Sequence, residues 1–478
     1  GIDRMKSMIR ERADWCISRQ RRWGLPIPVF YCADCGKPVC TDETIEAVSR
    51  LFAEKGSNAW FEMDAADILP RGFACPHCGK STGFTKEEDT LDGWFDSGST
   101  HFAAMKKDQG FWPATMYLEG LDQYRGWFQS SLLTAVGAFG EGAPFKECVT
   151  HGWTVDGEGR AMHKSLGNGV DPADIFNENG ADILRLWAAS ADYHADVRCS
   201  KAIFQQLSQN YLKFRNTCKF MLDNLVDFDP THLTKAEDMP VLDRWLITKL
   251  NELIEKVEQS YNDYEFHIIT HAVNDFCVTT LSSFYLDIVK DRLYCEAADS
   301  AERRSAQTAL YLTLSTLAKL FAPILAFTCD EIWLAMPHTA EDDARNVVLN
   351  DMNKPFTAYA LDAETMARWE HIIEVRTAVN GALEEARAAK VIGKSLEADV
   401  HLTVPEGDVF LADENPAALA DLFIVSKVEL TVGGELAVKV ENAAGTKCPR
   451  CWKHSLTPNA EGLCPRCAEV VRHLPDLL

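Results

Sequence analysis

Residues 114–127 read Ala-Thr-Met-Tyr-Leu-Glu-Gly-Leu-Asp-Gln-Tyr-Arg-Gly-Trp, and this stretch indicates the fold class of the region around it. Ala114–Leu118 is a short apolar run typical of a strand, and Gln123–Phe139 has the pattern of a helix. A second strand is expected at Cys148–Val149, so the order is that of an α/β unit. Ligands bind at the carboxyl ends of strands in open α/β sheets, which is where Glu119 lies; a plain capped turn is the alternative.

The composition narrows the class of protein. The 478 residues are 46% apolar and 25% charged, which excludes a disordered, collagenous or membrane-embedded chain. The formal net charge of −23 means that the surface as a whole repels nucleic acid. A nucleic-acid partner must therefore be held by local basic patches, and residues 1–25 and the tail from Gly445 are locally basic.

The most apolar stretch is Tyr311–Cys329, which is long enough on paper to span a bilayer. It carries Lys319 and Pro323 near its centre, so a buried helix within a bundle is the better interpretation. Residues 200–335 have a helical pattern throughout, and Pro240 marks the start of a long amphipathic helix. We therefore expect no membrane segment.

The cysteines indicate metal sites. Eight of the sixteen fall in four C-x-x-C pairs, and no export signal points to disulfides, so a reducing cytoplasm is expected. Two knuckles near the end of the chain have the spacing for a tetrahedral, structural zinc site; coincidental cysteines are the alternative. Their four thiols are Cys448, Cys451, Cys464 and Cys467.

A second candidate zinc site lies in residues 31–85. Its two knuckles are separated by a 39-residue insert, with a helical stretch expected around Thr44–Lys55. Two unrelated redox pairs are the alternative, although no βαβ context of thioredoxin type surrounds them. The four thiols of this candidate are Cys32, Cys35, Cys75 and Cys78.

The segment Gly157–Asn168 (Gly-Glu-Gly-Arg-Ala-Met-His-Lys-Ser-Leu-Gly-Asn) has the features of a mobile, glycine-bounded loop. It presents Lys164 next to the small polar side chains of Ser165 and Asn168. Such a loop can close a cation over a polyphosphate. A solvated surface turn is the alternative. A further cluster, Thr90–Ser99, mixes aromatic and short polar side chains and is suited to the wall of a pocket.

Taken together, these motifs resemble the class I aminoacyl-tRNA synthetases, and most closely the bacterial isoleucyl-tRNA synthetase family. The resemblance extends from residue 1 to residue 478 and is specific in its combination of motifs. The segments that carry it are Asp14-Trp-Cys-Ile-Ser-Arg-Gln-Arg-Arg-Trp-Gly24, Trp94–Ser99, Glu119–Trp127, Ala161–Ser165, Gly180-Ala-Asp-Ile-Leu-Arg-Leu-Trp187 and the terminal cysteine module.

The resemblance implies a multidomain α/β plus α fold. It includes the second half of a Rossmann-type catalytic domain, a helical-bundle anticodon-binding domain, a small α+β unit and a C-terminal zinc module. The implied ranges are 1–30 for the chain's return into the catalytic domain, 31–85 for an inserted zinc-ribbon-like cassette, 86–198 for the catalytic half, 199–355 for the anticodon-binding domain, 356–444 for an α+β junction and 445–478 for the zinc finger.

The family's reaction is an ATP-dependent ligation. An isoleucine–tRNA ligase activates L-isoleucine to isoleucyl-adenylate with ATP and Mg²⁺, then transfers it to tRNA(Ile). By resemblance Lys164 is the catalytic lysine of the family's KMSKS loop, and Glu119, Gln123, Trp127 and Trp94 contact the adenylate or the amino acid. Zinc is structural, and a cytoplasmic enzyme, monomeric when complete, is expected.

Three departures from the family pattern qualify this expectation. The loop reads Ala-Met-His-Lys-Ser where the family usually has KMSKS, so Ala161 and His163 replace a lysine and a serine. No HIGH-type motif is present, nor the threonine-rich editing domain. We therefore expect a C-terminal half that is inactive without its N-terminal half. The alternatives are a stand-alone tRNA-binding protein derived from a synthetase, or a class I synthetase specific for valine or leucine.

Overall fold

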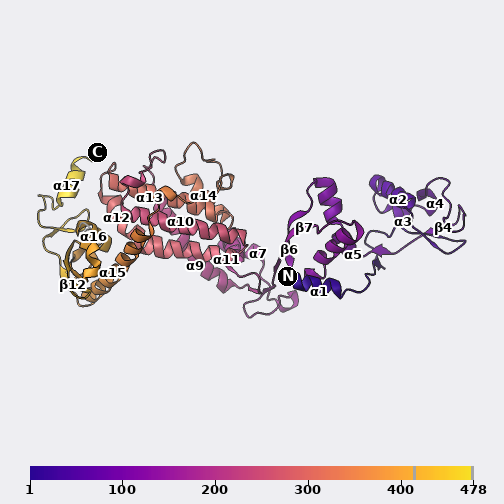
Figure 1. Ribbon diagram of the computed structural model, residues 1–478, viewed down its shortest axis with the longest axis horizontal. Coiled ribbons are helices and arrows are strands. Elements are labelled where there is room, and N and C mark those ends of the chain that lie inside the picture. Colours follow the sequence, from indigo (N-terminus) through magenta and orange to yellow (C-terminus); the bar gives the residue numbers. More distant parts are fainter. Residues whose placement is uncertain (413–415, 475–478) are drawn as a thin grey trace. The chain divides into compact units, whose positions relative to one another are not determined.

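The computed structural model describes residues 1–412 and 416–474, and these fall into two compact units. The first unit comprises Gly1–Val155 with Tyr193–Val197, and the second comprises Asp156–Asp192 with Arg198–Leu478. The short strands β8 (Thr154–Val155) and β9 (Val197–Arg198) lie where the chain passes from one unit to the other. Each unit is described separately below (Figure 1).

The first unit contains the expected α/β element. Strands β6 (Ala114–Gly120) and β7 (Phe145–His151) are parallel, with Tyr117 opposite Cys148. The connecting segment was expected to be one helix, but it is interrupted before Gly126. The 3-10 turn η2 (Leu121–Tyr124) comes first. After Gly126 the chain forms helix α6 (Trp127–Leu132), which continues as the π-helix η3 (Leu133–Ala138). Tyr117 of β6 and Phe128 of α6 are buried in the core that the strand and the helix share.

The rest of this part of the unit packs around that element. The segment before β6 supplies a short strand pair and three helices. They are α1 (Ile2–Arg10), β1 (Ser18–Arg19), antiparallel to β5 (Thr90–Leu91), then α5 (Gly93–Gly98) and the π-helix η1 (His101–Gln109). Helix α5 packs tightly on α6, since a Cβ on Gly98 would lie 2.8 Å from the Ser130 backbone.

The first cysteine cassette is a small α+β module. Its three strands, β2 (Phe30–Cys32), β3 (Pro38–Val39) and β4 (Phe84–Lys86), are antiparallel in the order β3-β2-β4. Helix α2 (Asp42–Lys55), which confirms the helical stretch expected there, begins with a capping box at Thr41. Helices α3 (Ala59–Glu62) and α4 (Ala65–Ile68) complete a core in which Trp60 is fully buried.

The second unit begins with the loop segment and leads into a helical bundle. The loop segment holds the 3-10 turn η4 (Lys164–Leu166), α7 (Pro172–Asn179) and α8 (Ala181–Ser190). The bundle confirms the helical pattern of residues 200–335. Its elements are α9 (Lys201–Asp223), the 3-10 turn η5 (Ala236–Asp238), α10 (Val241–Asn262), α11 (Phe266–Asp275), the π-helix η6 (Phe276–Tyr285), α12 (Leu286–Cys295), α13 (Ala301–Phe321) and α14 (Ala326–Ala335).

The stretch Tyr311–Cys329 is buried in this bundle, as expected, but it is not one helix. Helix α13 ends at Phe321 and α14 begins at Ala326, with Pro323 in the turn between them. Proline cannot donate to a helical ladder, which accounts for the break. Among the described residues, no helix is both long enough and apolar enough to cross a membrane.

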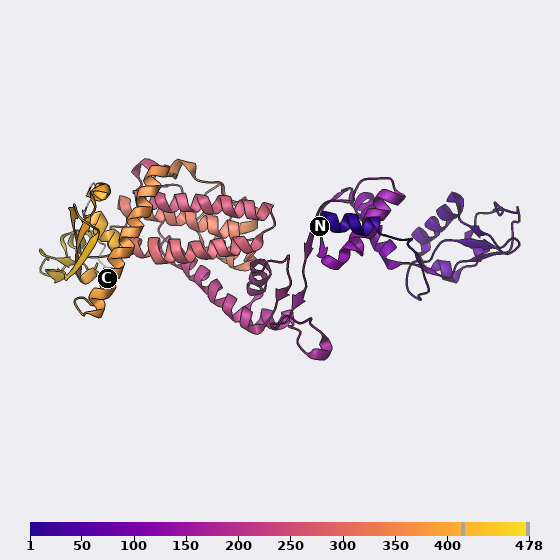
Figure 2. The same cartoon turned by 60° about the horizontal axis from the view of Figure 1, so that its bottom comes forward.

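The remainder of the second unit is the small α+β region and the terminal module. After the 3-10 turns η7 (Val347–Leu349) and η8 (Thr357–Tyr359), helix α15 (Ala363–Ala388) lies between the bundle and a three-stranded sheet (Figure 2). In this sheet β10 (Ala398–Val404) pairs in parallel with β11 (Lys427–Val432) and antiparallel with β12 (Ala437–Asn442). The 3-10 turn η9 (Ser395–Glu397) precedes β10, and η10 (Glu406–Ala412) follows it.

The reading of residues 397–440 as strands and turns missed one helix. Helix α16 (Pro416–Phe423) connects β10 to β11, as a parallel pair requires. The terminal module is small, with β13 (Thr446–Lys447), β14 (His454–Ser455) and α17 (Pro465–Arg472).

Candidate functional site

The carboxyl end of β6 presents Glu119 to solvent. In the parallel pair Glu119 lies opposite Thr150 of β7, and Gly120 lies opposite His151. Both strands therefore end at the same edge, with an exposed carboxylate at that edge. This is the position at which open α/β sheets bind ligands.

The other predicted pocket residues of the first unit cluster beside this edge. The Gln123 side-chain oxygen accepts a hydrogen bond from the Trp127 backbone N–H at 2.9 Å. The Trp127 ring stacks on buried Tyr117 with centroids 4.0 Å apart and planes 5° from parallel. A Cβ on Gly126 would lie 2.4 Å from the Gln123 side chain and 2.8 Å from the Trp94 ring. The structure thus brings Trp94, Gln123 and Trp127 together, while their roles stay a prediction.

Sequence reasoning missed Asp92, which anchors this cluster. Its carboxylate accepts hydrogen bonds from the Trp15 indole at 2.9 Å, from the Arg19 guanidinium at 2.9 Å and from the Trp94 backbone N–H at 3.2 Å. Asp92 therefore joins the segment Asp14–Gly24 to the start of α5. Its place as a helix cap before Gly-Trp-Phe was a local signal, but its distant partners were not visible in the sequence.

Lys164 lies in the second unit, at the start of η4. Its side chain is exposed, and it has no ion-pair partner among the residues that the structure describes. Two residues earlier, Met162 packs against a small core that contains Ile183 and Phe204. The loop is therefore anchored by one apolar side chain, while the lysine stays exposed. Its role in binding phosphates stays a prediction.

The segment Gly180–Trp187 joins this loop region to the bundle. The Asp182 carboxylate accepts hydrogen bonds from the backbone N–H of Phe327 at 3.3 Å and of Thr328 at 2.7 Å, at the start of α14. Arg185 donates to the carbonyl oxygens of Pro323 at 2.7 Å and Ile324 at 2.9 Å, just after α13. Two side chains of α8 thus bind the turn between two bundle helices.

The C-terminal thiols form a group suited to a metal ion. The sulfur atoms of Cys448, Cys451, Cys464 and Cys467 all lie within 4.8 Å of one another. Burial raises the pKa of Cys448, but the backbone N–H groups of Cys451 and Cys464 outweigh it and lower that pKa to about 6. A clustered set with a stabilised thiolate fits a tetrahedral Zn²⁺ site.

The first cassette holds a similar group. The sulfur atoms of Cys32, Cys35, Cys75 and Cys78 also lie within 4.8 Å of one another. Burial raises the pKa of Cys75, but the N–H groups of His77 and Cys78 lower it to about 7 overall. Both sets of cysteines could therefore hold zinc, in agreement with their spacing in the sequence.

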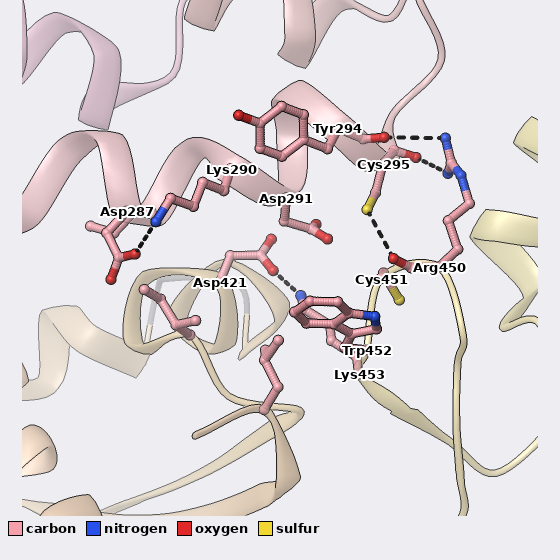
Figure 3. Close-up of a pocket in the computed structure, with 13 residues that line it drawn as sticks. Asp287, Lys290, Asp291, Tyr294, Cys295, Asp421, Arg450, Cys451, Trp452 and Lys453 are labelled. Carbon is pink, nitrogen blue, oxygen red and sulfur yellow. Dashed lines mark hydrogen bonds and ion pairs between the residues drawn. The ribbon is translucent and has the colours of Figure 1, made fainter. Parts of the chain in front are cut away.

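Two arginines dock the C-terminal module onto the bundle, and sequence reasoning missed both. Arg450 donates to the carbonyl oxygens of Tyr294 and Cys295, at the end of α12 (Figure 3). Arg466 binds Asp291 at 2.8 Å and Glu296 at 2.8 Å. Each arginine occupies the third position of a Cys-Pro-Arg-Cys knuckle, a repetition that was visible in the sequence.

A pocket of about 440 Å³ lies beside this contact, between α12, α16 and the first knuckle of the module. Its acids are paired: Asp287 with Lys290 and Asp421 with Lys453 (Figure 3). The Trp452 side chain forms part of the wall and is half exposed. Charged and apolar side chains therefore share the wall of the pocket, and its third acid, Asp291, is paired with Arg466.

Comparison with known proteins agrees with this architecture. The family model for class I tRNA synthetases (I, L, M and V) matches residues 1–200, and the model for the anticodon-binding domain of tRNA ligase matches residues 243–402. The chain belongs to the class I tRNA synthetases, as the resemblance of its motifs implied. The LeuRS–tRNA–LeuAMS complex of Agrobacterium radiobacter K84 shares the fold, with a TM-score of 0.55 at 17% identity over 90% of this chain and 46% of that one.

Two of the curated relatives that the chain matches are isoleucine–tRNA ligases. The chain is 48% identical to the isoleucine–tRNA ligase of Moorella thermoacetica, over 99% of this chain and 53% of the relative. It is 49% identical to the isoleucine–tRNA ligase of Carboxydothermus hydrogenoformans, over 100% of this chain and 53% of the relative. The chain thus spans about half the length of the relatives it matches.

Proposed function

We propose that this chain supplies part of an isoleucine–tRNA ligase, which activates L-isoleucine to isoleucyl-adenylate with ATP and transfers it to tRNA(Ile). The observation that carries the proposal is the identity of 48–49% to ligases of that name over 99–100% of the chain. These names favour isoleucine over valine or leucine. An enzyme of this kind acts in the cytoplasm, and we propose a monomer.

The catalytic role belongs to Lys164 in this proposal. An exposed ammonium on a short turn, with no acid holding it among the described residues, is suited to neutralise ATP phosphates. A single preorganised donor to developing charge contributes about 2.7–4 kcal/mol to transition-state stabilisation. Mg²⁺ arrives with the ATP and neutralises further phosphate charge.

Substrate binding belongs to the cluster at the end of β6. Exposed Glu119 is suited to accept hydrogen bonds from the adenylate. Trp127 and Trp94 offer apolar surface to the isoleucine side chain, and Gln123 is held by the Trp127 backbone N–H. The catalytic portion comprises residues 1–30 and 86–198 in this proposal, with residues 31–85 as an inserted zinc-ribbon-like cassette.

The remaining domains bind tRNA and zinc. Residues 199–355 form the anticodon-binding domain, 356–444 the α+β junction and 445–478 the zinc finger. Each group of four cysteines holds one structural Zn²⁺. Because the chain carries a net charge of −23, its contacts with tRNA phosphates are local, and tRNA binding weakens as salt rises.

The test is isoleucine-dependent exchange between ATP and pyrophosphate. The chain is assayed alone and mixed with the other half of the Moorella relative, with valine and leucine as competing substrates. We expect exchange in the mixture, selective for isoleucine, and its loss in Lys164→Ala. The matched control is Lys235→Ala, an exposed lysine of the same unit. Selectivity for valine or leucine contradicts the proposal, and tRNA binding without exchange in either arrangement supports a tRNA-binding protein instead.

A further inference from the structure

The loop that carries Lys164 is closed at its base by a buried acid. Asp156 is only 6% exposed, and its Oδ1 accepts hydrogen bonds from the backbone N–H of Glu158 at 3.0 Å and of Arg160 at 2.8 Å. Its Oδ2 accepts from the Arg160 side chain at 2.9 Å and from the Asn168 amide at 2.9 Å. The Asn168 and Arg160 hydrogen bonds outweigh burial and hold the pKa of Asp156 well below its ordinary value. The carboxylate is therefore charged at neutral pH.

The Asn168 side chain fixes the other end of the loop. Its amide nitrogen donates to Asp156 and also to the Ala161 carbonyl oxygen, at 3.1 Å. Its amide oxygen accepts a hydrogen bond from the His163 backbone N–H at 2.9 Å. One side chain thus holds three points of the loop, and the last of them is the residue directly before Lys164.

Contacts on both sides restrict the backbone conformation of Lys164. His163 caps the turn η4, and the Leu166 N–H donates to the His163 carbonyl at 3.0 Å. Gly167 ends the turn with a φ of +60°, a conformation that favours glycine. The backbone of Lys164 is therefore fixed from both sides while its ammonium stays unpaired among the described residues.

We propose that Asp156 and Asn168 form a clasp that fixes the loop between them and so positions Lys164 for the phosphates of ATP. This inference rests on the phosphate-binding role proposed for Lys164. Asparagine is the side chain that the geometry requires, because both an N–H donor and an oxygen acceptor are used. Aspartate has the same length but lacks the donor, and it would face the charge of Asp156.

The first test measures the loop directly, in the 478-residue chain. We expect hydrogen exchange at the His163 amide to be slow in the unmodified chain, because that amide donates a hydrogen bond to the Asn168 side-chain oxygen. We expect Asn168→Ala and Asn168→Asp to speed this exchange, and Lys164→Ala to leave it unchanged. Adding Asp156→Asn to Asn168→Asp restores a donor opposite an acceptor at the 156–168 contact but not at the Ala161 carbonyl, so the double variant recovers part of the protection. Unchanged exchange in Asn168→Ala overturns the clasp.

The second test asks whether the clasp acts through Lys164. The readout is the ratio of affinities for ATP and adenosine, since only ATP carries the phosphates, and it is measured in the chain mixed with the other half of the Moorella relative. A hydrogen bond that involves a charged group is worth roughly tenfold or more in binding. We therefore expect Asn168→Ala and Lys164→Ala each to lower the ratio about tenfold, and the double variant to lower it no further than Lys164→Ala alone.

The outcomes separate this inference from the proposed function. If the unmodified chain, mixed with the other half of the Moorella relative, binds ATP and adenosine equally, the role of Lys164 is wrong and its positioning is wrong with it. If ATP is preferred and Asn168→Ala preserves the preference, the proposed function stands and the clasp does not. If the losses in the double variant add, Asn168 acts independently of Lys164, and the positioning role is overturned.

Discussion

Asp243 shows how much one residue contributes to this fold. It is fully buried on α10, and its carboxylate accepts hydrogen bonds from Arg292 at 2.8 and 3.0 Å, from the Tyr285 hydroxyl at 2.7 Å and from the Ser305 hydroxyl at 2.5 Å. Burial, and then the Asp243 charge, raise the pKa of Tyr285 well above its ordinary value, so that hydroxyl remains a donor. This network joins α10, η6, α12 and α13.

Removing that carboxylate destabilises the bundle strongly. Asp243→Ala leaves the Arg292 guanidinium, which is mostly buried, without its partner, and this costs about 3 kcal/mol, the lower end of the range for a buried pair. Urea unfolding monitored by far-ultraviolet circular dichroism measures the change in the free energy of unfolding. The control is Lys219→Ala, which breaks an exposed pair with Asp223 and changes this free energy by about 0.5 kcal/mol or less. Equal effects of the two variants contradict the prediction.

Asp227 makes stability depend on pH in the acid range. The hydrogen bonds that its carboxylate accepts from Arg303 lower its pKa, and a further one from Gln307 acts in the same direction. Burial raises the pKa, but the hydrogen bonds outweigh it, and the pKa is lowered to about 2. An unfolded aspartate has a pKa of about 3.9, so the native state binds fewer protons. The stabilisation by Asp227 is therefore complete above the unfolded pKa of about 3.9 and is lost as the pH falls toward the native pKa of about 2. We expect the melting temperature of Asp227→Asn to fall less steeply than that of the unmodified chain between pH 5 and 3. Asp238→Asn, at an exposed position, serves as control, and parallel curves for all three contradict the prediction.

At the scale of elements, α5 and α6 meet through a glycine that leaves no room for a side chain. Gly126→Ala places a methyl group against Trp94 and Gln123. Such overpacking lowers the free energy of unfolding by about 1–3 kcal/mol. Gly137→Ala is the matched control in the same helical segment, because a Cβ there meets nothing within 4 Å. We expect Gly137→Ala to raise the free energy of unfolding by about 0.5–1 kcal/mol, because alanine forms helices more readily than glycine. Chemical denaturation of the two variants checks the signs, and destabilisation by both indicates that the Gly126 contact is not the cause.

Elements also show what the sequence could and could not predict. Strand β6, helix α2 and the long α10 follow from local patterns of apolar residues and caps. The π-helical segments could not be predicted, because their wider hydrogen-bond ladder leaves no distinct residue pattern. Helix α16 was missed since its eight residues form a short apolar run that also suits a strand.

The candidate sites also contain some features that the sequence could predict and others that it could not. The four-cysteine groups follow from spacing alone, since a knuckle is a local structure. Asp92 and its partner Trp15 are 77 residues apart, and Arg450 reaches Cys295 across 155 residues. Such long-range pairs depend on how whole elements pack, which periodicity in one segment cannot show.

At the scale of the whole molecule, the two cysteine groups belong to different units. We expect two zinc ions per chain by elemental analysis. Cys78→Ser and Cys464→Ser each remove one, whereas Cys40→Ser, outside both groups, removes none. Because Arg450 and Arg466 bind the end of α12, Cys464→Ser also speeds hydrogen exchange at Leu293–Cys295, and Cys78→Ser does not. Slow exchange at α12 in both variants shows that the module docks without its metal.

The hydrogen bonds from α8 to the turn between α13 and α14 limit how these elements can move relative to one another. Asp182 binds the start of one bundle helix and Arg185 the end of the other, so the bundle and the Lys164 loop lie in one compact unit. Because the two side chains bind the turn from both of its ends, a shift of that turn relative to α8 requires these hydrogen bonds to break.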